Sequence, residues 1–395
     1  MTVERYGELG SAARILLGPG PSEPDPRVMQ AMITPVVGHL DPAFLNVMND
    51  TRDLLRSAFA TANRLTVAMS GTGSAGMETC MVNLLEPGDR AVICVNGAFG
   101  ERMAEMARRT GAETVIVRAP WGQPIDPADV EEALKQGGAK IVAFVHVETS
   151  TGVCQPVEEI ASCARAYGAL SVLDAVSSLG GMPVRIDEWG IDAAYSGSQK
   201  CLGAPPGLAP VTLNDRARER IARRKGAVQS WYLDLTLIEN YWGEARAYHH
   251  TAPISMVYAL REALRVAAAE GWEARFERHR RLGRALQAGL AAMGLELLAP
   301  REYRAPVVTA VRVPDGVDEA AVRRRLLAEY GIEIAGGLGE LKGQVWRIGL
   351  MGYSCRWRNV VLLLSALGAV LRDLGIQASV DEALSASAEA LAAGD

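Results

Sequence analysis

Two residues that could carry chemistry, Lys200 and Asp174, lie at or just after the carboxyl ends of two predicted strands that are consecutive in the chain. Asp174 lies near the carboxyl end of the apolar stretch 170–176, and Lys200 follows the stretch 192–197. Only five of the 41 lysine and arginine residues are lysines. A guanidinium stays protonated, whereas an amine can lose its proton and attack a carbonyl carbon. The pattern predicts an amine and a carboxylate that face one crevice at the end of a sheet.

A glycine-rich turn, SGTGSAGME at 70–78, lies between a predicted strand and a predicted helix. Its glycines match the spacing of dinucleotide-binding folds, which suggests an NAD-dependent dehydrogenase. That reading also requires an acidic residue at the end of the next strand to hold the ribose, and the strand at 90–95 ends in Asn96. The helix start, with the hydroxyls of Thr72 and Ser74, still predicts a phosphate-binding site.

A lysine, an aspartate and a phosphate cradle together favour pyridoxal 5'-phosphate (PLP) as cofactor. The lysine amine forms a Schiff base with the cofactor aldehyde, and the carboxylate keeps the pyridine nitrogen protonated so that the ring accepts electrons. A Schiff-base aldolase needs only the lysine, so the aspartate and the glycine turn argue against it. A non-catalytic binding protein on the same scaffold, like a dehydrogenase, would carry no lysine-bound chromophore.

The elements that must position these residues alternate between short apolar runs and helical patterns. Strands are predicted at 66–69, 90–95, 114–117, 140–147, 170–176, 192–197 and 209–213, with helices at 74–85, 99–110, 127–136 and 156–167. Strands that are apolar on both faces are typical of a parallel sheet covered by helices on each side. The sequence therefore predicts a large α/β domain with a mainly parallel sheet.

The pattern changes near residue 252, where two long helices are predicted at 255–270 and 272–293. Strands at 307–313, 332–335 and 345–351 and helices at 318–330 and 357–374 then form an α+β unit. We expect an N-terminal arm at 1–24, a large domain at 25–254, and a linking helix with a small C-terminal domain at 255–395. The tail at 376–395 fits either a helix or a frayed end.

Composition narrows the function classes. The net charge of -5 argues against a dedicated nucleic-acid surface, which is usually basic. The six cysteines are scattered, without metal-ligand spacing to the five histidines, and fit reduced thiols in a cytoplasmic protein without a metal. No apolar run approaches the roughly 20 residues that span a bilayer, and the N-terminus has acidic residues where a signal peptide is basic.

Eight short motifs are distributed along the chain between about residues 15 and 374. In order they are LLGPGP (16–21), SGTGSAGME (70–78), NGAFGER (96–102), HVETSTGV (146–153), VLDAVSSLGG (172–181), SGSQKCLGAPPG (196–207), YHHTAP (248–253) and VWRIGLMG (345–352). In this order and spacing they resemble the class V aminotransferases, and within them the alanine-glyoxylate and serine-glyoxylate (serine-pyruvate) group. The resemblance implies fold type I, the aspartate-aminotransferase fold. It also implies a homodimer with active sites at the subunit boundary.

The resemblance assigns the cofactor-binding residues by motif. Lys200 would form the Schiff base and shuttle the proton, Asp174 would pair with the pyridinium nitrogen, and Val176 would pack under the ring. Phe99 would stack on the ring, where the animal enzyme has a tryptophan. The residues that would hold the phosphate, the last two from the other subunit, are Thr72, Gly73, Ser74, Gln199, Tyr248 and Thr251.

The substrate-binding residues also come from the resemblance. Arg347 would bind the substrate carboxylate as a bidentate fork, aided by Thr149, which also lies beside the cofactor and replaces a serine of the animal enzyme. His39 would lie in a loop that lines the substrate entrance, either contacting substrate or bridging groups of the loop.

The function expected from this pattern is a ping-pong transamination through an aldimine of Lys200. The amino group of alanine or serine would pass to glyoxylate or pyruvate. Within the same family, ureidoglycine-glyoxylate transamination in purine breakdown shares every one of these motifs and is the nearest alternative. Pyridoxamine-pyruvate transamination is a third, and the intact GTGS and YHHT segments argue against it because they suggest a bound phosphate cofactor.

Overall fold

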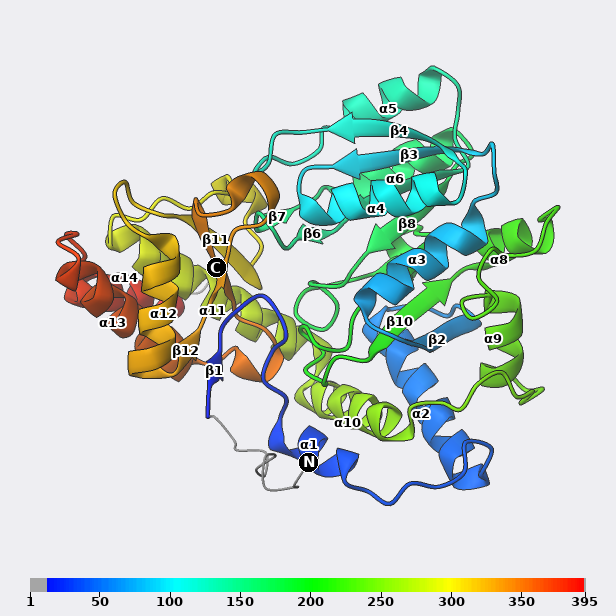
Figure 1. Ribbon diagram of the computed structural model, residues 1–395, viewed down its shortest axis with the longest axis horizontal. Helices are drawn as coiled ribbons and strands as arrows, with labels where there is room; N and C mark the ends of the chain where they lie inside the picture. Colours follow the sequence, from blue (N-terminus) through cyan, green and yellow to red (C-terminus); the bar gives the residue numbers. More distant parts are fainter. Residues whose placement is uncertain (1–12, 394–395) are drawn as a thin grey trace, which may run out of the picture.

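The computed structural model describes residues 13–393 of the chain. It has a larger part, built around one sheet, and a smaller part, and the two meet along two long helices (Figure 1). Residues 1–12 and 394–395 lie outside the described residues, and so do the first half of the predicted N-terminal arm and the end of the predicted tail. In Figure 1 the larger part is on the right and the smaller part, with the C-terminal helices, on the left.

A seven-stranded sheet forms the centre of the larger part. In spatial order its strands are β2 (Leu65–Ser70), β10 (Leu208–Leu213), β9 (Ala193–Tyr195), β8 (Leu170–Asp174), β5 (Ile141–Val145), β3 (Arg90–Val95) and β4 (Glu113–Arg118). β4, β3, β5, β8 and β9 run parallel, and every residue of β5, β8, β9 and β10 is buried. Burial on both faces explains why these strands lack polar alternation.

Helices connect the strands of this sheet and cover it. They are α1 (Pro26–Met32), α2 (Pro42–Ala58), α3 (Gly73–Leu84), α4 (Ala98–Arg109), α5 (Pro127–Lys135), α6 (Val157–Ala166), α7 (Ile186–Trp189), α8 (Asp215–Ala222) and α9 (Leu235–Trp242). An Asp-Pro pair begins α1, α2 and α5, and each aspartate accepts a hydrogen bond from a backbone N–H of the first turn. The local sequence therefore sets where these helices start.

The smaller part has its own sheet and core. Helices α10 (Ile254–Glu270) and α11 (Trp272–Ala292) lead to the antiparallel sheet of β11 (Val308–Arg312), β14 (Val345–Gly349) and β13 (Ala335–Gly336). Helices α12 (Glu319–Tyr330), α13 (Trp357–Asp373) and α14 (Val380–Ala392) complete it. The chain start also belongs here, because β1 (Ile15–Leu16) pairs with β12 (Ile332–Glu333).

The expected strands and helices appear within a few residues of their predicted ends, with one correction to the connection between β9 and β10. The sequence predicts repeated strand–helix–strand units with parallel strands. β10 departs from this prediction, because it is antiparallel to both of its neighbours, β2 and β9. The residues at 196–207 form a turn and not a helix, so the chain reverses direction. The tail forms α14, and the elements that the sequence pattern does not predict include α1, α2, α7, α9 and β1.

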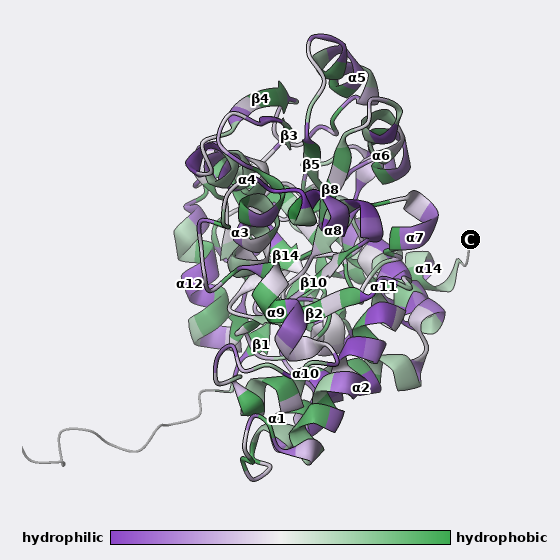
Figure 2. Ribbon diagram, turned by 90° about the vertical axis from the view of Figure 1, so that its right-hand side faces the viewer, coloured by the Kyte–Doolittle hydropathy of each residue, from purple (hydrophilic) through white to green (hydrophobic). Residues whose placement is uncertain are grey.

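Hydrophobic residues concentrate along strands such as β5, and hydrophilic residues on outer helices such as α8 (Figure 2). Within residues 13–393 no helix is both long enough and apolar enough to cross a membrane.

Gly100 sets how closely α4 approaches β3. A Cβ added at Gly100 would lie 2.8 Å from the Cys94 carbonyl oxygen and 2.9 Å from the Val95 Cα, both backbone atoms that cannot turn aside. We therefore expect Gly100→Ala to lower the free energy of unfolding by about 1–3 kcal/mol, measured by urea denaturation.

The matched control is Gly226→Ala, because a Cβ at Gly226 has no heavy atom within 4 Å. Its effect should stay within about 0.5 kcal/mol. Equal effects of the two substitutions would contradict this account of the helix–strand contact.

Candidate active site

The carboxyl ends of β8 and β9 bring Asp174 and Tyr195 side by side. The two residues are partners in the strand register, so their side chains leave the sheet edge together. Lys200 follows in the turn between β9 and β10. The sheet edge at which parallel strands end is the place where ligands bind in open α/β sheets.

The Asp174 carboxylate is buried and fully engaged. It is 3% exposed, and it accepts hydrogen bonds from the Val176 N–H at 2.8 Å and the Tyr195 hydroxyl at 2.9 Å. Burial raises the pKa of Asp174 to about 6, although these two hydrogen bonds act in the opposite direction. The carboxylate is therefore ionised at pH 7 but held in an environment that favours neutralisation by a cation.

The Lys200 amine is buried beside the N-terminal segment. Its side chain is 8% exposed, and Nζ donates a hydrogen bond to the Pro19 carbonyl. The Ser22 hydroxyl donates to the Lys200 carbonyl at 2.7 Å, and the Ser22 N–H to the Gln199 carbonyl at 2.8 Å. Burial, followed by the positive charge of Arg347, lowers the pKa of Lys200 to about 8. A substantial fraction of the amine is thus neutral near pH 8 and able to act as a nucleophile.

The glycine turn and the Lys200 turn converge on Val176. A Cβ placed on Gly73 would lie 3.3 Å from the Val176 Cγ2, and one on Gly197 would lie 3.5 Å from its Cγ1. Thr72 precedes α3 without a capping hydrogen bond from its side chain. Oε1 of Gln199 is buried without a hydrogen-bond partner in the described part of the chain. A cradle of small residues and free polar groups therefore lies at this helix N-terminus.

Phe99 lies in the first turn of α4, and a buried carboxylate fixes that turn. Glu148, on β6 (Val147–Glu148), accepts hydrogen bonds from the Phe99 N–H at 3.2 Å and the Gly100 N–H at 3.3 Å. The Arg102 guanidinium lies over the Phe99 ring, 4.8 Å from its centroid, and donates to the Ser74 hydroxyl at 3.0 Å. These contacts place the Phe99 ring beside the glycine turn.

Arg347 reaches the same region from β14 of the smaller part. It is 8% exposed, and its guanidinium donates to the Gly336 carbonyl at 2.7 Å and the Thr149 carbonyl at 3.2 Å. The Thr149 hydroxyl is 2.6 Å from the Ser177 hydroxyl. Burial lowers the pKa of Arg347 to about 10, which still leaves it fully protonated at neutral pH. A guanidinium held by two carbonyls keeps further N–H groups for a carboxylate ligand.

His39, Tyr248 and Thr251 lie apart from this group. Tyr248 is 61% exposed, Thr251 is also exposed, and the rings of Tyr248 and His39 are 5.1 Å apart. Across residues 13–393, the hydrogen bonds and ring contacts of His39 and Tyr248 join neither residue to Lys200, Asp174 or Arg347. The structure thus brings together most of the predicted site residues within one chain, and leaves these three on the surface.

Several residues with clear roles in this geometry escaped the sequence analysis. Glu148 holds α4, Tyr195 holds Asp174, and Pro19 and Ser22 hold the Lys200 turn. Tyr195 could have been found from the strand alignment, because it ends the strand next to that of Asp174. The contacts of Pro19 and Ser22 had no local signal. Groups of three or more side chains able to hold a metal ion do not occur among residues 13–393.

The family described as aminotransferase class-V matches residues 19–355 of the chain. A similar relative is the (S)-ureidoglycine–glyoxylate transaminase of Bacillus subtilis (strain 168), which is 45% identical over 391 residues, covering 94% of each chain. The alanine–glyoxylate aminotransferase of Drosophila melanogaster is 38% identical over 377 residues, which cover 94% of this chain and 96% of that one.

A solved structure shows the same arrangement of the chain. The alanine–glyoxylate aminotransferase from a Nostoc species superposes with a TM-score of 0.92 at 49% sequence identity, covering 94% of this chain and 99% of that one. The expected fold, a large mainly parallel sheet with a smaller α+β part, is therefore confirmed.

Asp174 is expected to cost stability when no cofactor neutralises it. Its folded-state pKa is raised, so stability falls as pH rises from about 4 through 6, and the penalty at pH 7 and above is about 3 kcal/mol. Asp174→Asn removes the charge; its amide oxygen can still accept from the Val176 N–H, and its NH2 group can donate to the Tyr195 hydroxyl oxygen. We expect the cofactor-free variant to melt at a higher temperature than wild type at pH 8, with a gap that closes toward pH 4.

Asp192→Asn is the matched control, because Asp192 is equally buried but forms an ion pair with Arg216 at 3.0 Å. Removing one partner of such a pair should lower stability. An Asp174→Asn variant that melts below wild type at pH 8 would show that the buried charge is compensated within the chain.

Proposed function

The chain belongs to the class-V aminotransferases, and we propose that this PLP-dependent transaminase moves the amino group of alanine or serine to glyoxylate or pyruvate. One observation carries the proposal. Asp174, a buried carboxylate, lies at the end of β8, and Lys200, a buried amine with a pKa of about 8, lies in the turn after the neighbouring strand β9, both beside a cradle of small residues. The transaminase chemistry needs each of these groups.

The residues at the site fit PLP. A phosphate suits the N-terminus of α3, where the backbone N–H groups and the hydroxyls of Thr72 and Ser74 are available. The side-chain amide of Gln199, whose Oε1 is buried without a partner, supplies a further polar group. Gly73 and Gly197 keep the space next to Val176 free of side chains, as a planar ring requires.

We assign the ring contacts as follows. Bound PLP supplies an aldehyde that condenses with amines and a protonated ring that accepts the electrons released at the substrate Cα. Asp174, ionised at pH 7, would keep the ring nitrogen of a bound cofactor protonated. Val176 and Phe99 would contact its ring, and Glu148 fixes the Phe99 backbone.

Lys200 and Arg347 act on the substrate. The neutral Nζ of Lys200 takes the proton from the substrate Cα, and its lowered pKa makes the neutral form accessible near pH 8. Arg347 binds the substrate carboxylate, and its bonds to Gly336 and Thr149 fix its orientation before substrate arrives. A carboxylate held in one orientation would fix the position of the substrate Cα relative to Lys200.

A second donor is supported by a specific finding. The relative at 45% identity is a ureidoglycine–glyoxylate transaminase, whereas the Nostoc structure at 49% identity is an alanine–glyoxylate aminotransferase. Both names include glyoxylate, so glyoxylate is the better supported acceptor. (S)-ureidoglycine is the alternative donor to alanine and serine.

We further propose that the protein is a homodimer with shared active sites. Tyr248 and Thr251 are exposed in one chain, and a group of exposed hydrophobic side chains, Ile33, Val36, Leu40 and Trp231, lies in the segments that flank them in sequence or space. In such a dimer, Tyr248 and Thr251 would help to hold the cofactor phosphate of the partner site, and His39, which contacts Tyr248, would line the substrate entrance.

We propose that residues 25–254 form the domain that binds the cofactor. Residues 255–395, the linking helix and the small domain, supply Arg347. The six cysteines are all unpaired, which suits a reducing compartment such as the cytoplasm.

The reaction is tested with a panel of donors and acceptors. We expect alanine, serine or (S)-ureidoglycine to react with glyoxylate, with pyruvate as a second acceptor, and the purified protein to show a visible absorption band. Borohydride should abolish the band and fix the cofactor to Lys200, located by mass spectrometry of peptides. Pyridoxamine with pyruvate completes the panel.

Lys200→Ala should lose the visible band and at least about 10³-fold in kcat. The amine both binds the cofactor and moves the proton, and the proton transfer alone contributes about 10²–10⁴-fold. Lys225→Ala, an exposed lysine, is the control and should behave as wild type. A colourless protein that binds NADH would refute the assignment, and absent activity with glyoxylate would refute the proposed acceptor.

The shared site is tested by complementation between two inactive variants. Lys200→Ala is mixed with the double variant Tyr248→Ala, Thr251→Ala after dissociation and reassociation. A mixed dimer then contains one site with every defect and one intact site. We expect activity to return in the mixture, up to half that of wild type per mixed dimer. If Tyr248 and Thr251 served their own chain, no intact site would form and activity would stay absent.

A further inference from the structure

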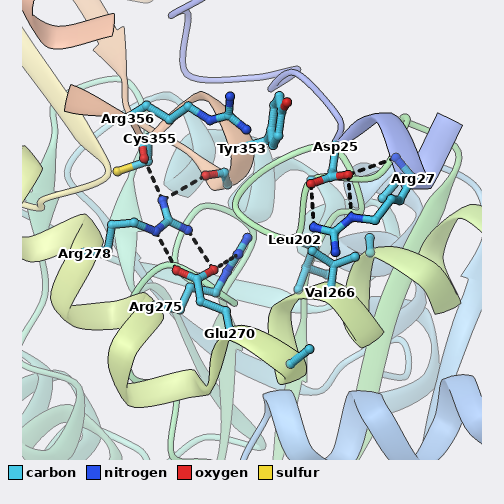
Figure 3. Close-up of a pocket in the computed structure, with 15 residues that line it drawn as sticks. Asp25, Arg27, Leu202, Val266, Glu270, Arg275, Arg278, Tyr353, Cys355 and Arg356 are labelled. Carbon is cyan, nitrogen blue, oxygen red and sulfur yellow. Dashed lines mark hydrogen bonds and ion pairs between the residues drawn. The ribbon is translucent and has the colours of Figure 1, made fainter. Parts of the chain in front are cut away.

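The start of α11 carries two buried polar residues, Arg275 and His279, one helical turn apart. They lie where the larger and smaller parts meet, and Arg275 forms part of the cluster shown in Figure 3 with Glu270, Arg278 and Cys355. Arg275 is 5% exposed and His279 is fully buried. Their side chains form hydrogen bonds with Gly180, Cys201, Glu270 and Gly352, and not with the side chains of Lys200, Asp174 or Arg347.

Arg275 uses three guanidinium nitrogens in three different directions. Nε donates to the Gly180 carbonyl, Nη2 to the Cys201 carbonyl and Nη1 to the Glu270 carboxylate, each at 2.7 Å. Cys201 follows Lys200 directly, and Gly180 closes the turn that begins after Asp174. One guanidinium thus ties together the two turns that carry the lysine and the aspartate.

His279 connects the same helix to the smaller part. The Gly352 N–H donates to its Nε2 at 3.0 Å, so this nitrogen must accept, and Nδ1 carries the proton that it donates to the Arg275 carbonyl at 2.8 Å. The imidazole is therefore neutral, and burial lowers its pKa to about 3. Gly352 begins the turn that follows β14, the strand of Arg347.

Arg278 and Glu270 complete the connection. Arg278 donates to the Gly352 carbonyl at 3.2 Å and the Cys355 carbonyl at 2.7 Å, and it shares the Glu270 carboxylate with Arg275. A cavity of about 420 Å³ opens beside the cluster (Figure 3). On the side that faces this cavity, hydrogen bonds of Arg275 and Arg278 connect α11 to the turns.

We propose that Arg275 and His279 are positioning residues for the transamination. They hold three segments in fixed positions relative to one another where the two parts meet: the turn that contains Lys200, the turn after Asp174 and the turn after the strand of Arg347. The inference rests on the proposed function, because it assigns these turns to the reaction. Its physical basis is geometric. Lys200 must face the cofactor while Arg347 presents the substrate carboxylate, and a displacement of about 1 Å between such groups can cost about 100-fold in rate.

The first test replaces Arg275 by Lys and by Met. Lysine has a single charged nitrogen and cannot reproduce the planar fork, so both variants should lower kcat about 10- to 100-fold. The amino-acid KM should change less than threefold. The pH midpoint of the visible absorption band should move by at least half a unit, because the geometry of Lys200 against Asp174 changes.

Leu286→Ala is the matched control for stability, because Leu286 is a buried core residue of the same helix without polar contacts to the turns. It should lower the melting temperature while leaving kcat and the band titration near wild type.

The second test compares His279→Leu with His279→Gln. Leucine leaves the Gly352 N–H without an acceptor, so the turn after β14 should shift and KM for the amino acid and the oxo acid should rise about tenfold or more. The amide oxygen of glutamine can occupy the place of Nε2 and should restore KM to within about threefold. A residue needed only for folding would show no such rescue in KM.

The two proposals fail in different ways. A wild-type protein without transaminase activity would refute the proposed function. An active wild type in which Arg275→Lys retains kcat within twofold and an unshifted absorption band would overturn the positioning role. If Arg275→Met does not accumulate as folded protein, Arg275→Lys and the His279 pair decide the question.

Discussion

The arrangement of the site depends on the burial of the Lys200 amine. A buried ammonium is costly, so the protein holds an amine whose pKa is about 8 instead of its ordinary value. Asp174, one strand away, is buried with the opposite effect on its proton. The folded chain thus holds two groups whose environments weaken their charged forms, and a ligand with an aldehyde and a cationic ring relieves both penalties.

Close approach of the backbone is the second requirement, and the glycine turns and the N-terminal segment provide it. Gly73 and Gly197 leave the face of Val176 open, and Gly20 lies against Lys200, where a Cβ would come within 2.5 Å of the side-chain Cδ. The segment that contains Pro19 and Ser22 closes over the lysine turn after pairing with the smaller part through β1. Residues 19–22 of the predicted arm therefore form part of the surroundings of Lys200.

The site also depends on the contact between two distinct hydrophobic cores. One core surrounds the large sheet, and the other contains β14 and the helices at its back. Lys200 and Asp174 come from the first and Arg347 from the second. Polar contacts of Arg347 with Thr149, and of α11 with the turns beside Lys200 and Arg347, cross between them. Directional hydrogen bonds suit this task because they fix orientation where apolar packing alone would permit sliding.

The sequence by itself predicted the strands of the large sheet and the family, because apolar periodicity and short motifs are local properties, and it singled out Lys200 and Asp174 as candidate site residues. It also indicated the helix N-terminus at Thr72 from its glycines and hydroxyls. Only the tertiary structure decided the antiparallel direction of β10, the bond of Tyr195 to Asp174, the support of Phe99 by Glu148 and the closure of Pro19 on Lys200. The three side-chain contacts join residues that are 21 to 181 positions apart in the chain. The Tyr195 contact follows from the pairing of β8 with β9, whereas the contacts of Glu148 and Pro19 have no local signal, because only the folding of the whole chain brings these groups within hydrogen-bonding distance.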